Sequence, residues 1–112
     1  MEIPHKIVIN QVPWTVTVDE PLDPADEGAT YTSRLEIRIN GEVNEDKHDA
    51  IFWHELIHAI CNSREINVKR DIKTEEDLAR LLGPALLEFF ATNAEMIWKE
   101  PNGSGEEKNE SI

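Results

Sequence analysis

The sequence predicts one α+β domain, in which a short three-stranded antiparallel sheet packs against a central helix and a second helix kinked by proline. Short β-branched runs in the first forty residues alternate apolar and polar side chains, which is typical of half-exposed strands. Two longer segments follow with helical spacing of apolar residues, each behind a residue that favours a helix start. The chain of 112 residues is long enough for one modest core and too short for a separate substrate-binding domain.

Three segments are predicted to form the sheet. Residues 6–10 (KIVIN) and 14–18 (WTVTV) are separated by three residues and should form a hairpin. Residues 19–30 contain two prolines, one glycine and five acidic residues, a composition that predicts a solvated loop. Residues 31–40 (YTSRLEIRIN) alternate again and predict a third, half-exposed strand.

A central helix is predicted over about residues 45–62. Asn44 is its expected N-cap, because acidic residues occupy the next turns, where the positive end of the helix dipole favours carboxylates. The second half of this segment, IFWHELIHAI, is apolar on nearly every side, which indicates a helix that is buried over most of its surface.

A second, longer helix is predicted to begin after Thr74. Thr74 and Asp77 resemble a capping box, with Asp in place of the usual Glu. Pro84 removes one backbone donor inside this segment, which predicts a kink or two helices in succession. Residues 100–112 have no apolar face to bury and are expected to be a disordered acidic tail, so that residues 1–99 form the domain.

The composition excludes several classes of protein. The chain has 23 Asp and Glu against 11 Lys and Arg, and its net charge of -12 repels nucleic acid and anionic lipids. No apolar run is long enough to cross a bilayer. One cysteine cannot form an internal disulfide, and the amino terminus lacks the pattern of a secretory signal. We therefore expect a cytoplasmic protein that binds neither nucleic acid nor membranes.

The segment IFWHELIHAI places two histidines and a glutamate among apolar residues. His54 and His58 are four residues apart, so both imidazoles project from one face of a helix and can bind one metal ion. Two neutral imidazoles leave positions open on Zn²⁺ for a water, whose pKa falls to about 7 when it is bound. Glu55 is rotated away from the metal and can take the proton of that water as general base. The motif predicts a hydrolase. The alternative is a pair of core histidines that are hydrogen bonded within the protein.

The motif and its surroundings resemble a known family. HELIHAI, preceded by HKIVINQVPWTVTV and LEIRIN and followed by TEEDLARLLGPALLEFF, is similar to the small zincin-like metallopeptidases of bacteria and phages that are related to the ImmA/IrrE type. The resemblance covers about residues 5–98, and its specific part is the motif helix. It implies a minimal zincin-like fold, zinc-dependent cleavage of a peptide bond, and a third metal ligand, usually a glutamate, from a second helix.

Two glutamates are candidates for this third ligand. The resemblance implies Glu76, because Glu76, Ala79, Leu82 and Gly83 match the family's pattern at this helix. Helical periodicity instead favours Glu75, which shares a stripe with Ala79, Leu82 and Leu86. A solvated first helical turn that is rich in acids would explain both residues without a metal.

Three classes of function follow. The first is a zinc metallopeptidase acting on a peptide or protein, which the third strand, if it is an edge strand near the metal, would capture by strand addition. The second is a zinc-stabilised, non-catalytic interaction or regulatory module of phage or prophage origin. The third is a metal-free protein that binds a partner. The sequence makes no prediction of the oligomeric state.

Overall fold

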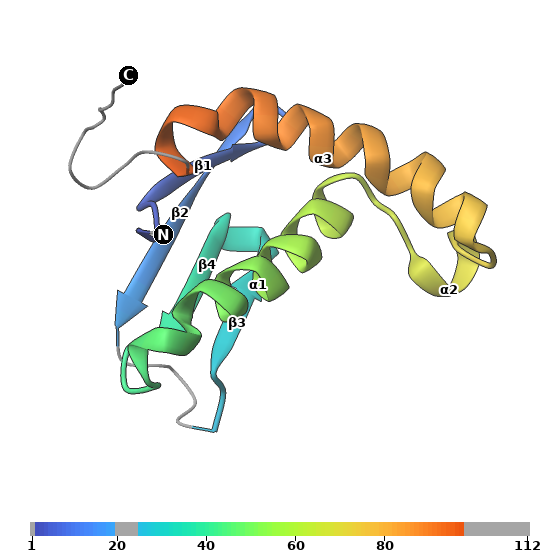
Figure 1. The fold of residues 1–112 in the computed structure, drawn as a ribbon. Helices are drawn as coiled ribbons and strands as arrows, with labels where there is room; N and C mark the ends of the chain where they lie inside the picture. The colour runs from blue at the N-terminus through green and yellow to red at the C-terminus, as the bar shows by residue number, and fades with distance from the viewer. Residues whose placement is uncertain (1, 20–24, 98–112) are drawn as a thin grey trace, which may run out of the picture.

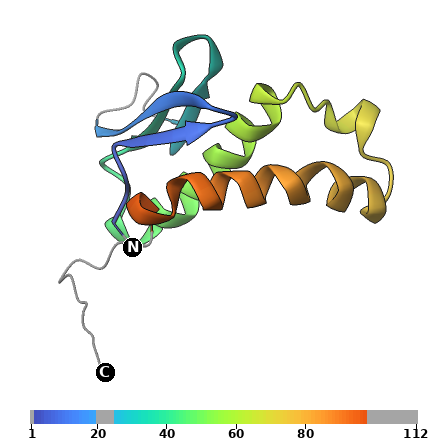
Figure 2. The ribbon, with the colours of Figure 1, turned by 90° about the horizontal axis from the view of Figure 1, so that it is seen from above.

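The computed structural model describes residues 2–19 and 25–97, which form a four-stranded sheet and three helices (Figure 1). The predicted tail at 100–112 lies outside the described residues. The elements are β1 (Lys6–Ile9), β2 (Val12–Asp19), β3 (Gly28–Tyr31), β4 (Glu36–Asn40), α1 (His48–Ser63), α2 (Val68–Asp71) and α3 (Glu75–Ile97), with 3₁₀ turns η1 (Thr32–Arg34) and η2 (Glu45–Lys47). Figure 2 shows α1 and α3 on the same face of the sheet.

The sheet is mixed, with strand order β1-β2-β4-β3. β1 pairs antiparallel with β2 and β3 antiparallel with β4, whereas β2 and β4 are parallel. The predicted α+β class is confirmed, and the predicted three-stranded antiparallel sheet is wrong. The reason is β3, which forms at the end of the segment expected to be a loop and returns the chain so that β4 lies alongside β2.

The first hairpin turns earlier than predicted. Its two turn residues are Asn10 and Gln11, with φ of 51° and 69°. Positive φ at both central residues is the signature of a type I′ turn, whose twist matches that of the strands it joins. Val12 and Pro13 therefore belong to β2, where Val12 pairs with Ile9.

The predicted strand at 31–40 is divided in two. Tyr31 ends β3, η1 follows, and β4 begins at Glu36. Leu35 has φ of 53° and is 38% exposed. Strict alternation predicts that it lies on the buried face of the strand with Ile37 and Ile39, and it does not. Ile37 and Ile39 remain on the buried face as the alternation predicts.

Both predicted helix starts are present. The Asn44 side chain accepts a hydrogen bond from the backbone N–H of Asp46 (2.9 Å), at the start of η2, which leads into α1. The Thr74 hydroxyl accepts from the N–H of Asp77 (3.1 Å), at the start of α3. α3 continues through Pro84 as one helix, so the predicted possibility of two helices in succession is wrong. Gly83 and Pro84 are both exposed within this helix.

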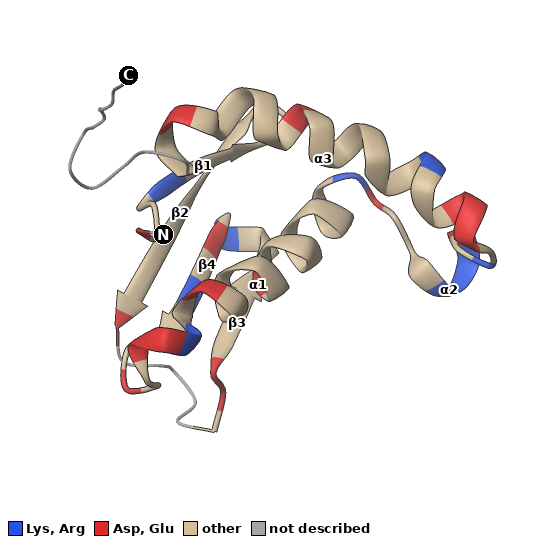
Figure 3. Ribbon diagram, viewed as in Figure 1, with Lys and Arg blue, Asp and Glu red and all other residues tan. Residues whose placement is uncertain are grey.

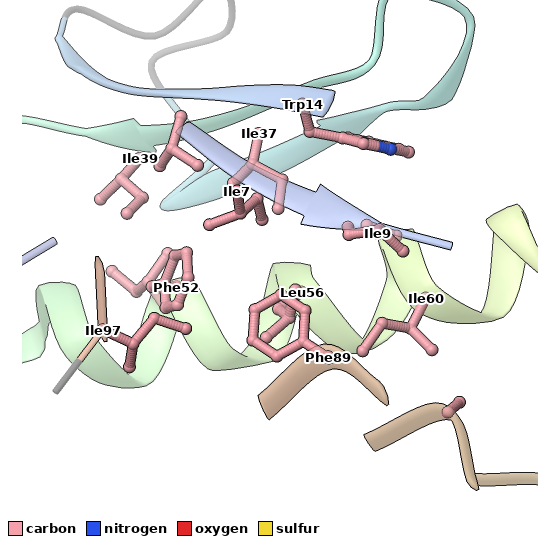
Figure 4. Close-up of a cluster of buried hydrophobic side chains, with 14 residues drawn as sticks. Ile7, Ile9, Trp14, Ile37, Ile39, Phe52, Leu56, Ile60, Phe89 and Ile97 are labelled. Atoms are coloured by element: carbon pink, nitrogen blue, oxygen red, sulfur yellow. The ribbon is translucent and has the colours of Figure 1, made fainter. Parts of the chain in front are cut away.

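The core lies between the sheet and the two long helices (Figure 4). The sheet, α1 and α3 each contribute buried side chains to this core. They are Ile7, Ile9, Trp14, Val16, Ile37, Ile39, Phe52, Leu56, Ala59, Ile60, Ala85, Phe89 and Ile97. No helix in the part of the chain that the structure describes is long and apolar enough to cross a membrane.

One buried amide joins α3 to the edge of the sheet. Asn93 is fully buried, and its side chain accepts from the N–H of Val8 (2.7 Å) and donates to the Val8 carbonyl (2.8 Å). It thus replaces the neighbouring strand that β1 lacks on its outer side. β3 forms the opposite edge of the sheet.

Candidate functional site

His54 and His58 lie side by side on the exposed face of α1. Their ring centroids are 5.0 Å apart, with the ring planes at 70°. The His54 side chain is 69% exposed, and His58 is also exposed. The alternative of hydrogen-bonded core histidines therefore finds no support, because both rings face water. Two imidazoles one turn apart supply two of the nitrogen donors that a zinc ion accepts.

Glu55 has the opposite environment, since it is 8% exposed. The Thr30 hydroxyl of β3 lies 2.7 Å from Glu55 Oε1 and 3.0 Å from the Glu55 carbonyl oxygen, and donates to this pair of acceptors. The second carboxylate oxygen, Oε2, lies 4.0 Å from His54 Nε2. The carboxylate is thus fixed on one side by β3 and faces an imidazole on the other.

Glycine at position 28 allows β3 to approach α1 this closely. A Cβ atom at Gly28 would lie 2.6 Å from Ile51 Cγ2 and 3.2 Å from Glu55 Cγ, which is closer than a side chain tolerates. The absence of a side chain at Gly28 therefore brings Thr30, two residues later on the same strand, within reach of Glu55.

A cleft of about 630 Å³ opens between the start of β3 and α1. Its lining residues are Ala25, Asp26, Glu27, Gly28, Lys47, Ala50, Ile51, His54 and Glu55. Figure 3 shows acidic residues on the segment leading into β3 and near the start of α1. The cleft, whose lining is mostly apolar with Asp26 and Glu27 at one side, lies directly beside the motif.

The two candidate third ligands lie elsewhere. Glu75 and Glu76 are exposed in the first turn of α3. Arg64, just after α1, pairs with Glu88 of α3. Glu76 lies twelve residues before Glu88, or about 18 Å along the helix at 1.5 Å per residue. The first turn of α3 therefore extends past the end of α1 (Figure 1).

The structure thus brings together His54, Glu55 and His58 but neither Glu75 nor Glu76. Among residues 2–19 and 25–97, no group of three His, Cys, Asp or Glu side chains is placed to hold a metal ion. The residues fit two donors of a zinc site in this conformation, and the identity of the third donor stays a prediction.

Sequence reasoning missed Gly28 and Thr30, which it assigned to a solvated loop. The two prolines and five acids of residues 19–30 dominated that interpretation. A β-branched and aromatic run, Thr30-Tyr31-Thr32, follows the glycine and was the available signal for a strand.

No protein-family model matches the chain, and neither a curated protein nor a solved structure is significantly similar to it. The function is therefore argued from the geometry of the site itself.

Proposed function

We propose that the chain is a zinc-dependent metallopeptidase, in which His54 and His58 hold the ion and Glu55 is the general base. The placement of the Glu55 carboxylate carries this proposal. Its Oε1 accepts a hydrogen bond from Thr30, its Oε2 lies 4.0 Å from His54 Nε2, and both residues of the motif line the cleft. Burying a carboxylate is costly, and here it adjoins two solvent-exposed imidazoles, as a base for hydrolysis at a metal requires.

Each residue has a separate task in this reaction. His54 and His58 would hold the zinc ion, which would supply a Lewis acid for the substrate carbonyl and for the attacking water. Glu55 accepts the proton of the attacking water and passes it to the departing amine, so one carboxylate acts as base and then as acid. Thr30 is a positioning residue, because its hydroxyl holds one Glu55 oxygen and leaves the other available for the proton.

The edge strand β3 is the proposed docking site for the peptide. β4 lies inside the sheet between β2 and β3, so the role expected for the third strand passes to β3. Asn93 already occupies the backbone groups of Val8 at the opposite edge. A peptide that adds to β3 as a strand would run past Thr30 and Glu55. The edge strand β3 lies against the motif helix α1 through the contact of Thr30 with Glu55. This arrangement supports the minimal zincin-like fold that forms part of the proposal.

The alternative of a non-catalytic zinc module receives less support. Structural zinc sites are usually closed by four protein donors. His54 and His58 are instead open to solvent and border a cleft.

Glu55→Gln tests the catalytic assignment. The change keeps the shape and the acceptor for Thr30 but removes the base, so cleavage of a library of unstructured peptides, read by mass spectrometry, should fall at least about a hundredfold. The zinc content should be unchanged. Glu95→Gln, an exposed change on α3, is the matched control and should cleave like the wild type. Equal cleavage by Glu55→Gln and the wild type would overturn the proposal.

A further inference from the structure

Two residues of β3 present their backbone groups to the open edge of the sheet. The N–H of Asn40 donates to the carbonyl of Glu27 (2.8 Å), so these two residues form a hydrogen-bonded pair at the start of the ladder between β3 and β4. In an antiparallel ladder such pairs alternate with pairs that are not hydrogen bonded. Gly28 and Thr30 therefore direct their N–H and C=O groups away from β4. A peptide that adds to this edge would pair with Gly28 and Thr30.

The peptide residue opposite Gly28 would have its side chain on the side of α1. Side chains of residues that lie opposite one another on neighbouring strands project from the same face of a sheet. The Cβ position of Gly28 is 2.6 Å from Ile51 Cγ2 and 3.2 Å from Glu55 Cγ, so this face is the one that α1 covers. Gly28, Ile51 and Glu55 also line the cleft of about 630 Å³. The cleft therefore lies where one side chain of a bound peptide would enter.

The cleft combines an apolar wall with an acidic side. Its apolar wall includes Ala25, Ala50 and Ile51. Asp26 and Glu27 line one side and are exposed, on the segment that leads into β3, where Figure 3 shows acidic residues. Within residues 2–19 and 25–97, no ion pair or hydrogen bond engages either carboxylate. Both carboxylates are thus available to a cation in the cleft.

The charge of the cleft is negative even though one lysine lines it. Three carboxylates, those of Asp26, Glu27 and Glu55, stand against the single ammonium of Lys47. The chain as a whole has a net charge of -12, which attracts cationic groups over longer distances. Charge complementarity therefore favours a basic occupant and disfavours an acidic one.

We propose that this cleft is a specificity pocket for a lysine or arginine side chain of the bound peptide. The inference rests on the proposed function and names its class of substrate, a peptide with a basic residue at the position that pairs with Gly28. A long basic side chain has an apolar stem and a charged tip. The stem lies against Ala50 and Ile51, and the tip reaches Asp26 and Glu27. An acidic side chain at this position is repelled.

Peptide binding to the full chain with Glu55→Gln tests the pocket without cleavage. A set of fluorescent peptides rich in threonine and valine differs only in the central residue, which is lysine, arginine, norleucine or glutamate. Norleucine has the stem of lysine and lacks the ammonium group. By fluorescence anisotropy at low ionic strength, the lysine and arginine peptides should bind about five- to tenfold more tightly than the norleucine peptide. The glutamate peptide should bind most weakly, and added salt should reduce the differences.

Two matched double variants place the preference in the cleft. Asp26→Asn combined with Glu27→Gln keeps the shapes of both side chains and removes their charges. It should bring the affinity for the lysine peptide to within about twofold of that for the norleucine peptide. Glu42→Gln combined with Glu95→Gln removes the same net charge from exposed positions outside the cleft and should retain the preference.

Several results would overturn the pocket. They are equal affinities for the lysine and norleucine peptides, tighter binding of the glutamate peptide, and failure of every peptide to bind. A preference that survives Asp26→Asn with Glu27→Gln, or that disappears in Glu42→Gln with Glu95→Gln, would overturn it as well.

Cleavage by the wild type separates the pocket from the proposed function. Cleavage of the peptide library without regard to basic residues would overturn the pocket and leave the peptidase standing. Selective binding of the lysine and arginine peptides by a chain whose wild type cleaves none of the library would support the pocket and overturn the peptidase.

Discussion

At the scale of single residues, the Thr30 hydroxyl decides where the Glu55 carboxylate lies. Thr30→Val keeps the shape of the side chain and removes the donor to a carboxylate that is 8% exposed. We expect a loss of about 1–3 kcal/mol in the free energy of unfolding, measured by urea denaturation, because a buried charge loses its partner. Thr30→Ser should restore most of it. A Thr30→Val protein as stable as the wild type would show that the hydroxyl does not hold Glu55.

The residues of the site differ in how far the sequence predicts them. The positions of His54, Glu55 and His58 follow from local helix geometry, because the three lie within five residues. Thr30 is 25 residues from Glu55 and meets it only through the pairing of β3 with β4. No local pattern contains that information. The place of Glu76 depends in the same way on the docking of α3.

At the scale of elements, the short helix α2 is predicted to depend on pH. The pKa of Asp71 is lowered from 3.8 to about 2, first by its hydrogen bond from Arg70 and then by that from the backbone N–H of Asn67. A carboxyl group whose pKa is lower in the folded state than in the unfolded state stabilises the folded state at a pH above its unfolded pKa. This stabilisation is lost as the pH falls through the folded pKa. α2 should therefore loosen as the pH falls from about 4 toward 2.

The amide hydrogen exchange of residues 68–71 measures this loosening. Asp71→Asn should loosen α2 at pH 7 and remove the change between pH 4 and pH 2. A carboxyl titration of Asp71 with its midpoint near the ordinary 3.8 would contradict the assignment.

The helices were more predictable than the strands, for a physical reason. Helix starts are local, and Asn44 and Thr74 each cap within three residues of themselves. Strand pairing is not local. The parallel pairing of β2 with β4 depends on β3. β3 has only four residues, and the acidic, proline-containing stretch just before it in the sequence predicts a loop.

At the scale of the whole molecule, Asn93 holds the second long helix against the sheet. Asn93→Leu conserves the volume of the side chain but leaves Val8 N–H and C=O without the partners that Asn93 provides. We expect a loss of about 2–4 kcal/mol in the free energy of unfolding by urea, since two partly buried backbone groups lose their hydrogen bonds to Asn93. Thr92→Ala, an exposed neighbour, is the control. A loss no greater than that of Thr92→Ala would mean that apolar packing alone docks α3.

The most direct measurement on the central claim is the zinc content of purified protein by elemental analysis, for the wild type, His54→Ala, His58→Ala and the exposed control His5→Ala. We predict about one zinc per chain in the wild type and in His5→Ala, and little or none in the other two. A wild type without stoichiometric zinc, or a His54→Ala protein that retains it, would contradict the account.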